Sequence, residues 1–278
     1  MTGVDILNRL TRALILVLGG GLVLGSGRGS GECIQGIVVG QIHLAGIVII
    51  VGNYGSGKTE VAINLAVHQK RQGLDVKVAD LDLVNPYFRT REARKTLSAM
   101  GIETVLPPER LLQADLPILM PQVGGLIGAP GDLAILDVGG DDAGATVLAA
   151  LQHQLAPLAE RVTMLQVVNP FRPNTGSVEG CQRMRRAIEA SARMPVNQWV
   201  GNAHMLEETS PADFQLGLDF MGSLEAESGL AVAFVTAPHD LLPAIETSRL
   251  PWAVLPIHRQ LVPPWREPAG FGSERAQN

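Results

Sequence analysis

The sequence has few of the residues that build local metal and redox sites. Its 278 residues include only two cysteines, Cys33 and Cys181, which lie far apart. It has no C-x-x-C pair, no H-E-x-x-H run and no paired histidines. No metal site is therefore encoded locally, and two isolated thiols suit a reducing compartment.

Charge and long apolar runs are also scarce. Only 18% of the residues are charged, the net charge is −5, and there is no broad basic stretch of the kind that grips nucleic acid. The apolar stretch from Ala13 to Leu24 is too short and too interrupted by glycine to cross a bilayer. We expect neither a nucleic-acid partner nor a membrane span.

Aromatic residues make up only 4% of the chain, whereas 46% of it is hydrophobic, so we expect a core of Leu, Val, Ile and Ala. This length suits one large α/β domain or two small ones. We predict an N-terminal extension over 1–45, one domain over 46–260 and an irregular tail over 261–278.

The first segment resembles a secretory signal in outline, because Arg9 and Arg12 precede its apolar stretch. We interpret it instead as a poorly ordered extension of a cytoplasmic protein.

Strand and helix patterns alternate from Ile47 onward. The predicted strands are Ile47–Val51, Val76–Leu81, Glu103–Leu106, Leu133–Asp137, Val162–Val168, Gln198–Asn202, Ala231–Thr236 and Trp252–Ile257. The predicted helices are Lys58–Gln72, Arg89–Met100, Ile118–Ile127, Ala143–Leu155, Ser177–Ala192 and Pro211–Glu227. Such alternation predicts an α/β fold, a mostly parallel twisted sheet with helices on both faces.

A glycine-rich motif, G-x-x-x-x-G-K-S/T, joins the first predicted strand to the first predicted helix. It consists of Gly52, Asn53, Tyr54, Gly55, Ser56, Gly57, Lys58 and Thr59. Glycines let successive backbone amides turn inward around a phosphate chain, and the helix that follows adds the positive end of its dipole. Lys58 is then placed to reach the β- and γ-phosphates, and the Thr59 hydroxyl to bind Mg²⁺.

Two carboxylates end the second predicted strand. Asp80 and Asp82 are separated by one residue, so both point to the same side of the strand. Ligands of such sheets sit beyond the carboxyl ends of the strands. We therefore predict that Asp80 supports Mg²⁺ and that Asp82 orients the attacking water.

The fourth predicted strand ends in Asp137-Val138-Gly139-Gly140-Asp141. An apolar strand ending in Asp is the Walker B pattern, whose carboxylate supports Mg²⁺. Gly140 can offer a bare backbone amide to the γ-phosphate. Asp141 is a second candidate for orienting water.

Asn202 follows a later strand and is the candidate for reading the base. Its amide carries a donor and an acceptor, which matches a purine edge. GTP-specific proteins usually add the N-K-x-D pattern, and the chain has neither its lysine nor its aspartate here. The sequence therefore favours ATP as the nucleotide.

Together these motifs resemble the MinD/ParA/CobQ-like (SIMIBI) branch of P-loop NTPases, over about Ile47 to Ile257. The resemblance implies a three-layer P-loop NTPase fold. It also implies that Asp82 helps to position the hydrolytic water, that Asp137 to Asp141 form a switch, and that Asn202 lies at the base.

The chain departs from this family at one position of the glycine-rich motif. MinD and ParA members carry there a signature lysine that crosses a homodimer to the phosphates of the partner, and here the position holds Asn53. Asparagine has no charge to supply. Arg89 and Arg172 are the candidates to replace it.

The leading hypothesis is a Mg²⁺-dependent ATPase that acts as a nucleotide switch read by a protein partner. Lys58 and the loop amides stabilise charge on the phosphate oxygens in this hypothesis. One alternative is a small-molecule kinase or ATP-dependent ligase of cofactor metabolism. Another is a non-hydrolytic nucleotide-binding module, or a GTPase.

Overall fold

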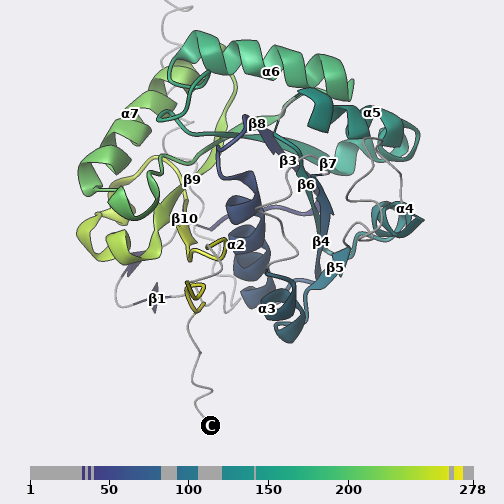
Figure 1. Cartoon of the computed structure of the whole chain (residues 1–278), viewed down its shortest axis with the longest axis horizontal. Coiled ribbons are helices and arrows are strands. Elements are labelled where there is room, and N and C mark those ends of the chain that lie inside the picture. The colour runs from purple at the N-terminus through teal and green to yellow at the C-terminus, as the bar shows by residue number, and fades with distance from the viewer. Residues whose placement is uncertain are drawn as a thin grey trace, which may run out of the picture. The chain divides into compact units, whose positions relative to one another are not determined.

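The computed structural model of the chain describes residues 33–34, 37–38, 41–82, 93–105, 121–140, 142–262 and 266–271. Eight of the described strands form one sheet in the order β10-β9-β8-β7-β3-β6-β4-β5 (Figure 1). Their bounds are β3 (Gly46–Gly52), β4 (Val76–Leu81), β5 (Glu103–Val105), β6 (Leu133–Val138), β7 (Val162–Val168), β8 (Gln198–Gly201), β9 (Val232–Pro238) and β10 (Val254–Ile257). Every neighbouring pair in the sheet is parallel, so the predicted sheet is confirmed.

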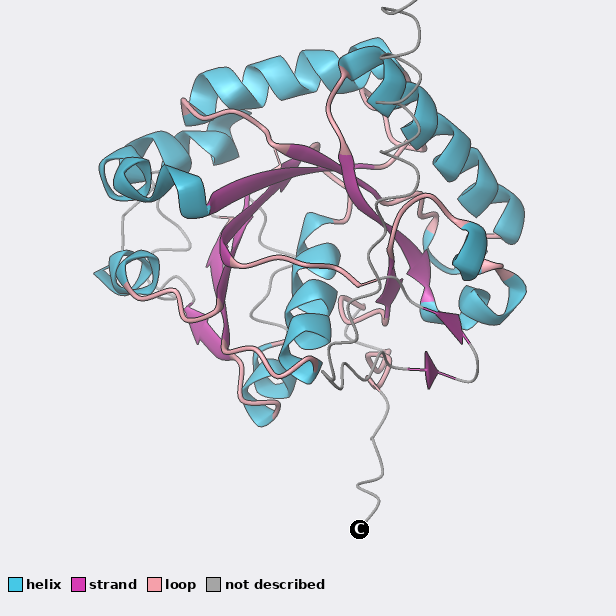
Figure 2. Ribbon diagram, turned by 180° about the vertical axis from the view of Figure 1, so that it is seen from behind, coloured by secondary structure: helices cyan, strands magenta, loops and turns pink. Residues whose placement is uncertain are grey.

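Helices cover both faces of the sheet, as Figures 1 and 2 show. They are α2 (Lys58–Arg71), α3 (Arg94–Ala99), α4 (Pro121–Gly128), α5 (Asp142–Leu155), α6 (Val178–Ala192) and α7 (Pro211–Ser228). The first two pack on one face and the other four on the opposite face. The fold is therefore the three-layer α/β sandwich of P-loop NTPases. A separate antiparallel pair joins β1 (Cys33–Ile34) to β2 (Ile37–Val38).

Strand β3 lies in the middle of the sheet because it is apolar on both sides. All seven of its residues are buried. Val48 and Ile50 join the core under α2, whereas Ile47, Ile49 and Val51 join the core under α4, α5 and α6. A β-branched run without polar alternation is what a central parallel strand requires.

The helices end where the sequence provides caps. α2 stops at Arg71, and Gly73 just beyond it has φ 90°, the left-handed conformation of a helix stop. Ser177 caps α6 by accepting a hydrogen bond from the Gly180 amide at 3.2 Å. Ser210 and Asp213 form a reciprocal capping box at the start of α7.

Two predicted helices differ from their described bounds by more than one residue. The helix expected from Ile118 is described as Pro121–Gly128. The helix expected from Arg89 is described only as Arg94–Ala99. Residues 118–120 and 89–92 lie outside the described part of the chain.

Short 3-10 segments were not predicted from the sequence. They are η2 (Ala156–Arg161), η3 (Leu206–Glu208), η4 (His239–Ala244) and η5 (Thr247–Arg249). Segments of one or two turns are too short for an apolar repeat to reveal them.

The core under α2 also includes Ile42 and Phe271, from either end of the chain, which are 3% and 7% exposed. Among the described residues, no helix combines the length and the apolar character needed to cross a membrane.

Two glycines of α7 should respond oppositely to substitution by alanine. A Cβ on Gly217 would lie 2.2 Å from the Cβ of Ala203, whereas a Cβ on Gly222 would meet its nearest neighbour, Trp252, at 3.9 Å. We expect G217A to lower the free energy of unfolding by about 1–3 kcal/mol through overpacking. We expect G222A to raise it by up to about 1 kcal/mol through helix propensity. Urea unfolding measures both, and a G217A protein as stable as G222A contradicts the close approach.

Candidate functional site

The glycine-rich loop makes a compact turn between β3 and α2. Gly52, Gly55 and Gly57 have φ of 145°, 72° and 89°, conformations that favour glycine. The Ser56 amide donates to the Asn53 carbonyl at 3.1 Å, which closes the turn. Gly57 is the N-cap of α2, so the amides of the first helical turn, for which a helix supplies no acceptor of its own, lie at the loop. This arrangement suits an anion.

Lys58 lies over this loop and beside the turn after β6. Its Nζ donates to the Asn53 carbonyl at 3.1 Å, and the residue is only 7% exposed. A Cβ on Gly140 would lie 2.6 Å from Lys58 Nζ and 2.9 Å from Tyr54 Cα, so only glycine fits at this position. The structure thus brings Lys58, Tyr54 and Gly140 together.

Three carboxylates lie at the ends of β4 and β6. Asp80 and Asp137 are paired across these neighbouring strands and are 0% and 1% exposed. Asp80 Oδ1 accepts a hydrogen bond from the Asp82 amide at 3.0 Å. Asp82 lines the same pocket as Lys58 and Thr59. The parallel sheet has therefore gathered Asp80, Asp82 and Asp137 at one edge.

Asn202 connects the end of β8 to the glycine-rich loop. Its Nδ2 donates to the Ser56 carbonyl at 2.7 Å, and its Oδ1 accepts from the Thr236 hydroxyl at 2.5 Å. The residue is 5% exposed, yet it lines the pocket. Asn202 therefore supports the loop through one of its two amide hydrogens, and its second one is available to a ligand.

A pocket of about 270 Å³ opens above the loop. Besides residues of the loop, it is lined by Glu60, Asp82, Asn169, Arg172, Asn202, His204, Leu206, Ile257, Arg259 and Leu261. It combines cations, carboxylates and apolar walls. Such a mixture can hold a ligand with an anionic end and an apolar ring.

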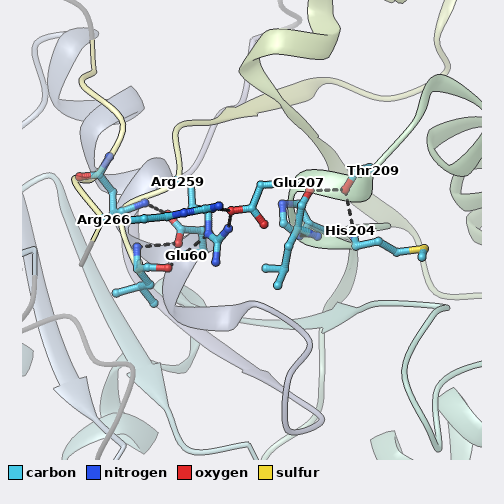
Figure 3. Close-up of polar contacts among 10 residues, drawn as sticks. Glu60, His204, Glu207, Thr209, Arg259 and Arg266 are labelled. Carbon is cyan, nitrogen blue, oxygen red and sulfur yellow. Dashed lines mark hydrogen bonds and ion pairs between the residues drawn. The ribbon is translucent and has the colours of Figure 1, made fainter. Parts of the chain in front are cut away.

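His204 also lines the pocket, and Figure 3 shows it beside Glu207 and Thr209. Its Nδ1 accepts a hydrogen bond from the Leu206 amide at 2.9 Å. Burial, followed by the positive charges of Arg259 and Arg172, lowers the pKa of His204 from 6.5 to about 4. At neutral pH this ring is therefore uncharged, and its other nitrogen is a donor.

The segment after β10 is tied to the first turns of α2 through Glu60 (Figure 3). The Glu60 carboxylate accepts hydrogen bonds from the Gln260 amide at 2.7 Å and the Leu261 amide at 3.1 Å. Burial raises the pKa of Glu60, and these donors oppose the rise. Arg259 and Arg266 both pair with Glu207 of η3, which brings the C-terminal segment to the pocket wall.

The residues present fit a magnesium ion only together with a phosphate ligand. In the described segments no group of three or more His, Cys, Asp or Glu side chains could hold a metal by itself. Thr59, Asp80 and Asp137 supply the hard oxygen atoms that Mg²⁺ prefers, and this ion is usually held by one or two carboxylates plus substrate phosphates. The Ser56 hydroxyl is buried in the loop and has no hydrogen-bond partner in the described structure, which leaves a donor for an anion.

Two predicted candidates, Asp141 and Arg89, lie outside the described residues. Other pocket residues were not predicted at all: Glu60, Leu206, Ile257, Arg259 and Leu261. The position of Arg259 just after the last strand could have indicated it, because that is the ligand-binding edge of the sheet. Nothing in the local sequence marks the others.

No protein-family model matches the chain, and no curated protein matches it. Its fold is similar to that of FtsY from Thermotoga maritima, with 16% identity over 76% of this chain and 66% of that chain and a TM-score of 0.49. Chloroplast FtsY from Physcomitrella patens is 18% identical over 71% of this chain and 59% of that chain, with a TM-score of 0.48. The signal recognition particle 54 kDa protein from Aeropyrum pernix K1, in complex with GDP, is 17% identical over 83% of this chain and 53% of that chain, with a TM-score of 0.45. The chain thus spans about half to two thirds of the length of these structures, and a likeness at such identities concerns the fold alone.

The lowered pKa of His204 makes stability depend on pH. Between about 6.5 and about 4 the unfolded chain binds a proton that the folded His204 does not, so the free energy of unfolding falls as the pH falls through this window. Burial also lowers the pKa of His258 to about 4, so His258 adds to the slope of the free energy of unfolding against pH. Replacing His204 by Asn, whose Oδ1 can accept from the Leu206 amide, should flatten the profile measured by urea unfolding. Equal slopes for H204N and wild type would contradict this assignment.

Proposed function

We propose that this chain is a nucleotide-binding P-loop protein and, more specifically, a Mg²⁺-dependent ATPase that acts as a molecular switch. The observation that carries the proposal is the meeting of Lys58, Thr59 and Asp82 around one pocket of about 270 Å³ at the N-terminus of α2. A phosphate chain needs such a junction of backbone donors, an ammonium group and metal-binding oxygens.

The phosphates would lie in the loop, with Lys58 and the amides of the first turn of α2 facing their oxygens. Thr59, Asp80 and Asp137 would hold Mg²⁺ together with the phosphates. When bound, this ion supplies charge neutralisation at the phosphate oxygens. Gly140 brings backbone close to Lys58, which supports its role beside the terminal phosphate.

Asp82 is the residue we assign to orienting the attacking water. It is 7% exposed and lines the pocket, and a Cβ on Gly139 would lie 3.3 Å from its Oδ1. Its carboxylate is therefore positioned between the end of β4 and the glycines that follow β6. Asp141 remains the alternative for this role.

The base would lie toward Asn202, His204, Leu206 and Ile257, where the pocket has apolar walls and few polar groups. We propose adenine, because the N-K-x-D pattern of guanine readers is absent here. The site we propose is that of a MinD/ParA-like protein without the signature lysine. A cytoplasmic location, a homodimer and a protein partner that reads the nucleotide state belong to the same proposal.

Removing the Lys58 ammonium group tests nucleotide binding. We expect K58A to weaken ATP binding by at least about 10-fold and to abolish hydrolysis, because Lys58 alone supplies a full charge within the loop. Titration calorimetry with ATP, ADP and GTP in the presence of Mg²⁺ measures the affinities. K70A is the matched control, since Lys70 lies on the same helix and outside the pocket lining. Unchanged ATP binding and turnover by K58A would overturn the proposal.

Replacing Asp82 by asparagine separates binding from hydrolysis. D82N keeps the size of the side chain and loses its charge, so we expect ATP affinity within about 3-fold of wild type. We expect phosphate release to fall about 10²-fold or more, as for the loss of a residue that orients or activates water. D219N on the exposed face of α7 is the control. If D82N hydrolyses ATP at the wild-type rate, the water-orienting residue is another one.

A further inference from the structure

Arg172 lies against the glycine-rich loop although it comes from a distant part of the chain. It belongs to the segment that joins β7 to α6, and its Nε donates to the Gly55 carbonyl at 3.1 Å. The side chain also lines the pocket that Lys58 and Asp82 line. A guanidinium group, which stays charged at every relevant pH, is thus present at the apex of the loop.

The segment that carries Arg172 is held by the protein from several directions. Asn169, 1% exposed, accepts from the Phe171 amide at 3.0 Å and donates to the His204 carbonyl at 2.9 Å. The hydroxyl of Thr175, 0% exposed, donates to the Asn169 carbonyl at 2.7 Å. Arg172 is therefore presented by a preorganised turn, which a catalytic group requires.

Asn53 holds the same segment to the glycine-rich loop. Its Nδ2 donates to the Pro173 carbonyl at 2.7 Å, next to Arg172 in the chain. Asn53 and Gly55 of the loop thus bond to the two consecutive residues Pro173 and Arg172. Asn53, which stands where the MinD and ParA members carry the signature lysine, is thus linked to the segment that carries the charged Arg172 of the same subunit.

Arg172 forms no ion pair with a described carboxylate, whereas Arg259 and Arg266 both pair with Glu207. Among the described residues, the Arg172 side chain donates to the neutral Gly55 carbonyl through Nε, and its remaining guanidinium N–H groups are donors for an anionic ligand.

We propose that Arg172 is a catalytic arginine supplied in cis, and that Asn53 is the residue that positions it. The inference rests on the proposed function and extends it. During hydrolysis the water oxygen bonds to the γ-phosphorus while the bond to the β–γ bridging oxygen breaks, and the proton of the water leaves with the phosphate products. Arg172 transfers no proton; it stabilises the charge on the phosphate oxygens. Hydrolysis is therefore a property of the single subunit.

Three substitutions of Arg172 separate its charge from its hydrogen bond. We expect R172A and R172Q to lower kcat about 10²- to 10³-fold, with ATP affinity within about 3-fold of wild type. Glutamine can still donate to the Gly55 carbonyl, so a purely structural arginine would be rescued by R172Q. R172K keeps a charge and should recover part of the rate. R186A, at an exposed position of α6, is the matched control and should behave as wild type.

Mixing two impaired variants distinguishes an arginine in cis from one in trans. An arginine that crossed to a partner subunit would let D82N supply its intact Arg172 to the site of R172A, so the mixture would regain activity. We expect no recovery at any mixing ratio, and a wild-type rate per subunit that is independent of protein concentration. Recovered activity would overturn the assignment in cis.

A double-mutant cycle tests the role of Asn53. If Asn53 acts through Arg172, N53A should lower kcat in the wild type and have no further effect in R172A. Additive losses would show that Asn53 acts independently and would remove it from the proposal.

Calorimetry with ATP and Mg²⁺ on the same proteins separates the two levels of inference. A wild-type protein that does not bind ATP refutes the proposed function, and the role of Arg172 falls with it. A wild-type protein that binds and hydrolyses ATP, beside an R172A protein of equal kcat, refutes the role of Arg172 alone.

Discussion

The Asn202 amide holds the glycine-rich loop against the sheet. One side of it donates to the Ser56 carbonyl and the other accepts from Thr236, so β8 and β9 both support the turn between β3 and α2. The loop itself contains three glycines with positive φ, and fixing them costs conformational entropy. A buried amide that bonds through both its nitrogen and its oxygen offsets that cost more reliably than an exposed contact does. The pocket, its lysine and its carboxylates keep their relative places because this turn is fixed.

Much of the fold was predictable because the spacing of apolar residues in the sequence follows which side chains of each strand and helix are buried. The strand Val76–Leu81 and the strand Val162–Val168 have the predicted bounds, since both are buried runs with clear ends. The acidic and amide residues of the site were predictable for a related reason: parallel strands end at one edge of the sheet, so Asp80, Asp137 and Asn202 all lie at that edge.

The remainder depends on contacts between segments far apart in the chain. Glu60 receives the amides of Gln260 and Leu261 some 200 residues later, and no local pattern encodes that meeting. The same holds for Asn53, which the motif alone assigns to the nucleotide but which donates to Pro173 in the folded chain. Its short amide fits the gap between two loops, a role that depends on shape and not on a sequence signature.

Cys181 at the start of α6 adds a practical consequence. Its Sγ donates to the carbonyl of Thr175, in the turn that presents Arg172, at 3.4 Å, and burial raises the pKa of the thiol to about 12. A thiol of this kind reacts only when the turn and the helix separate, because the thiolate is the nucleophile. With Cys33 replaced by serine it is the sole thiol of the chain. The rate at which it is alkylated then reports how often the turn opens. Mass spectrometry measures this rate without any attached label.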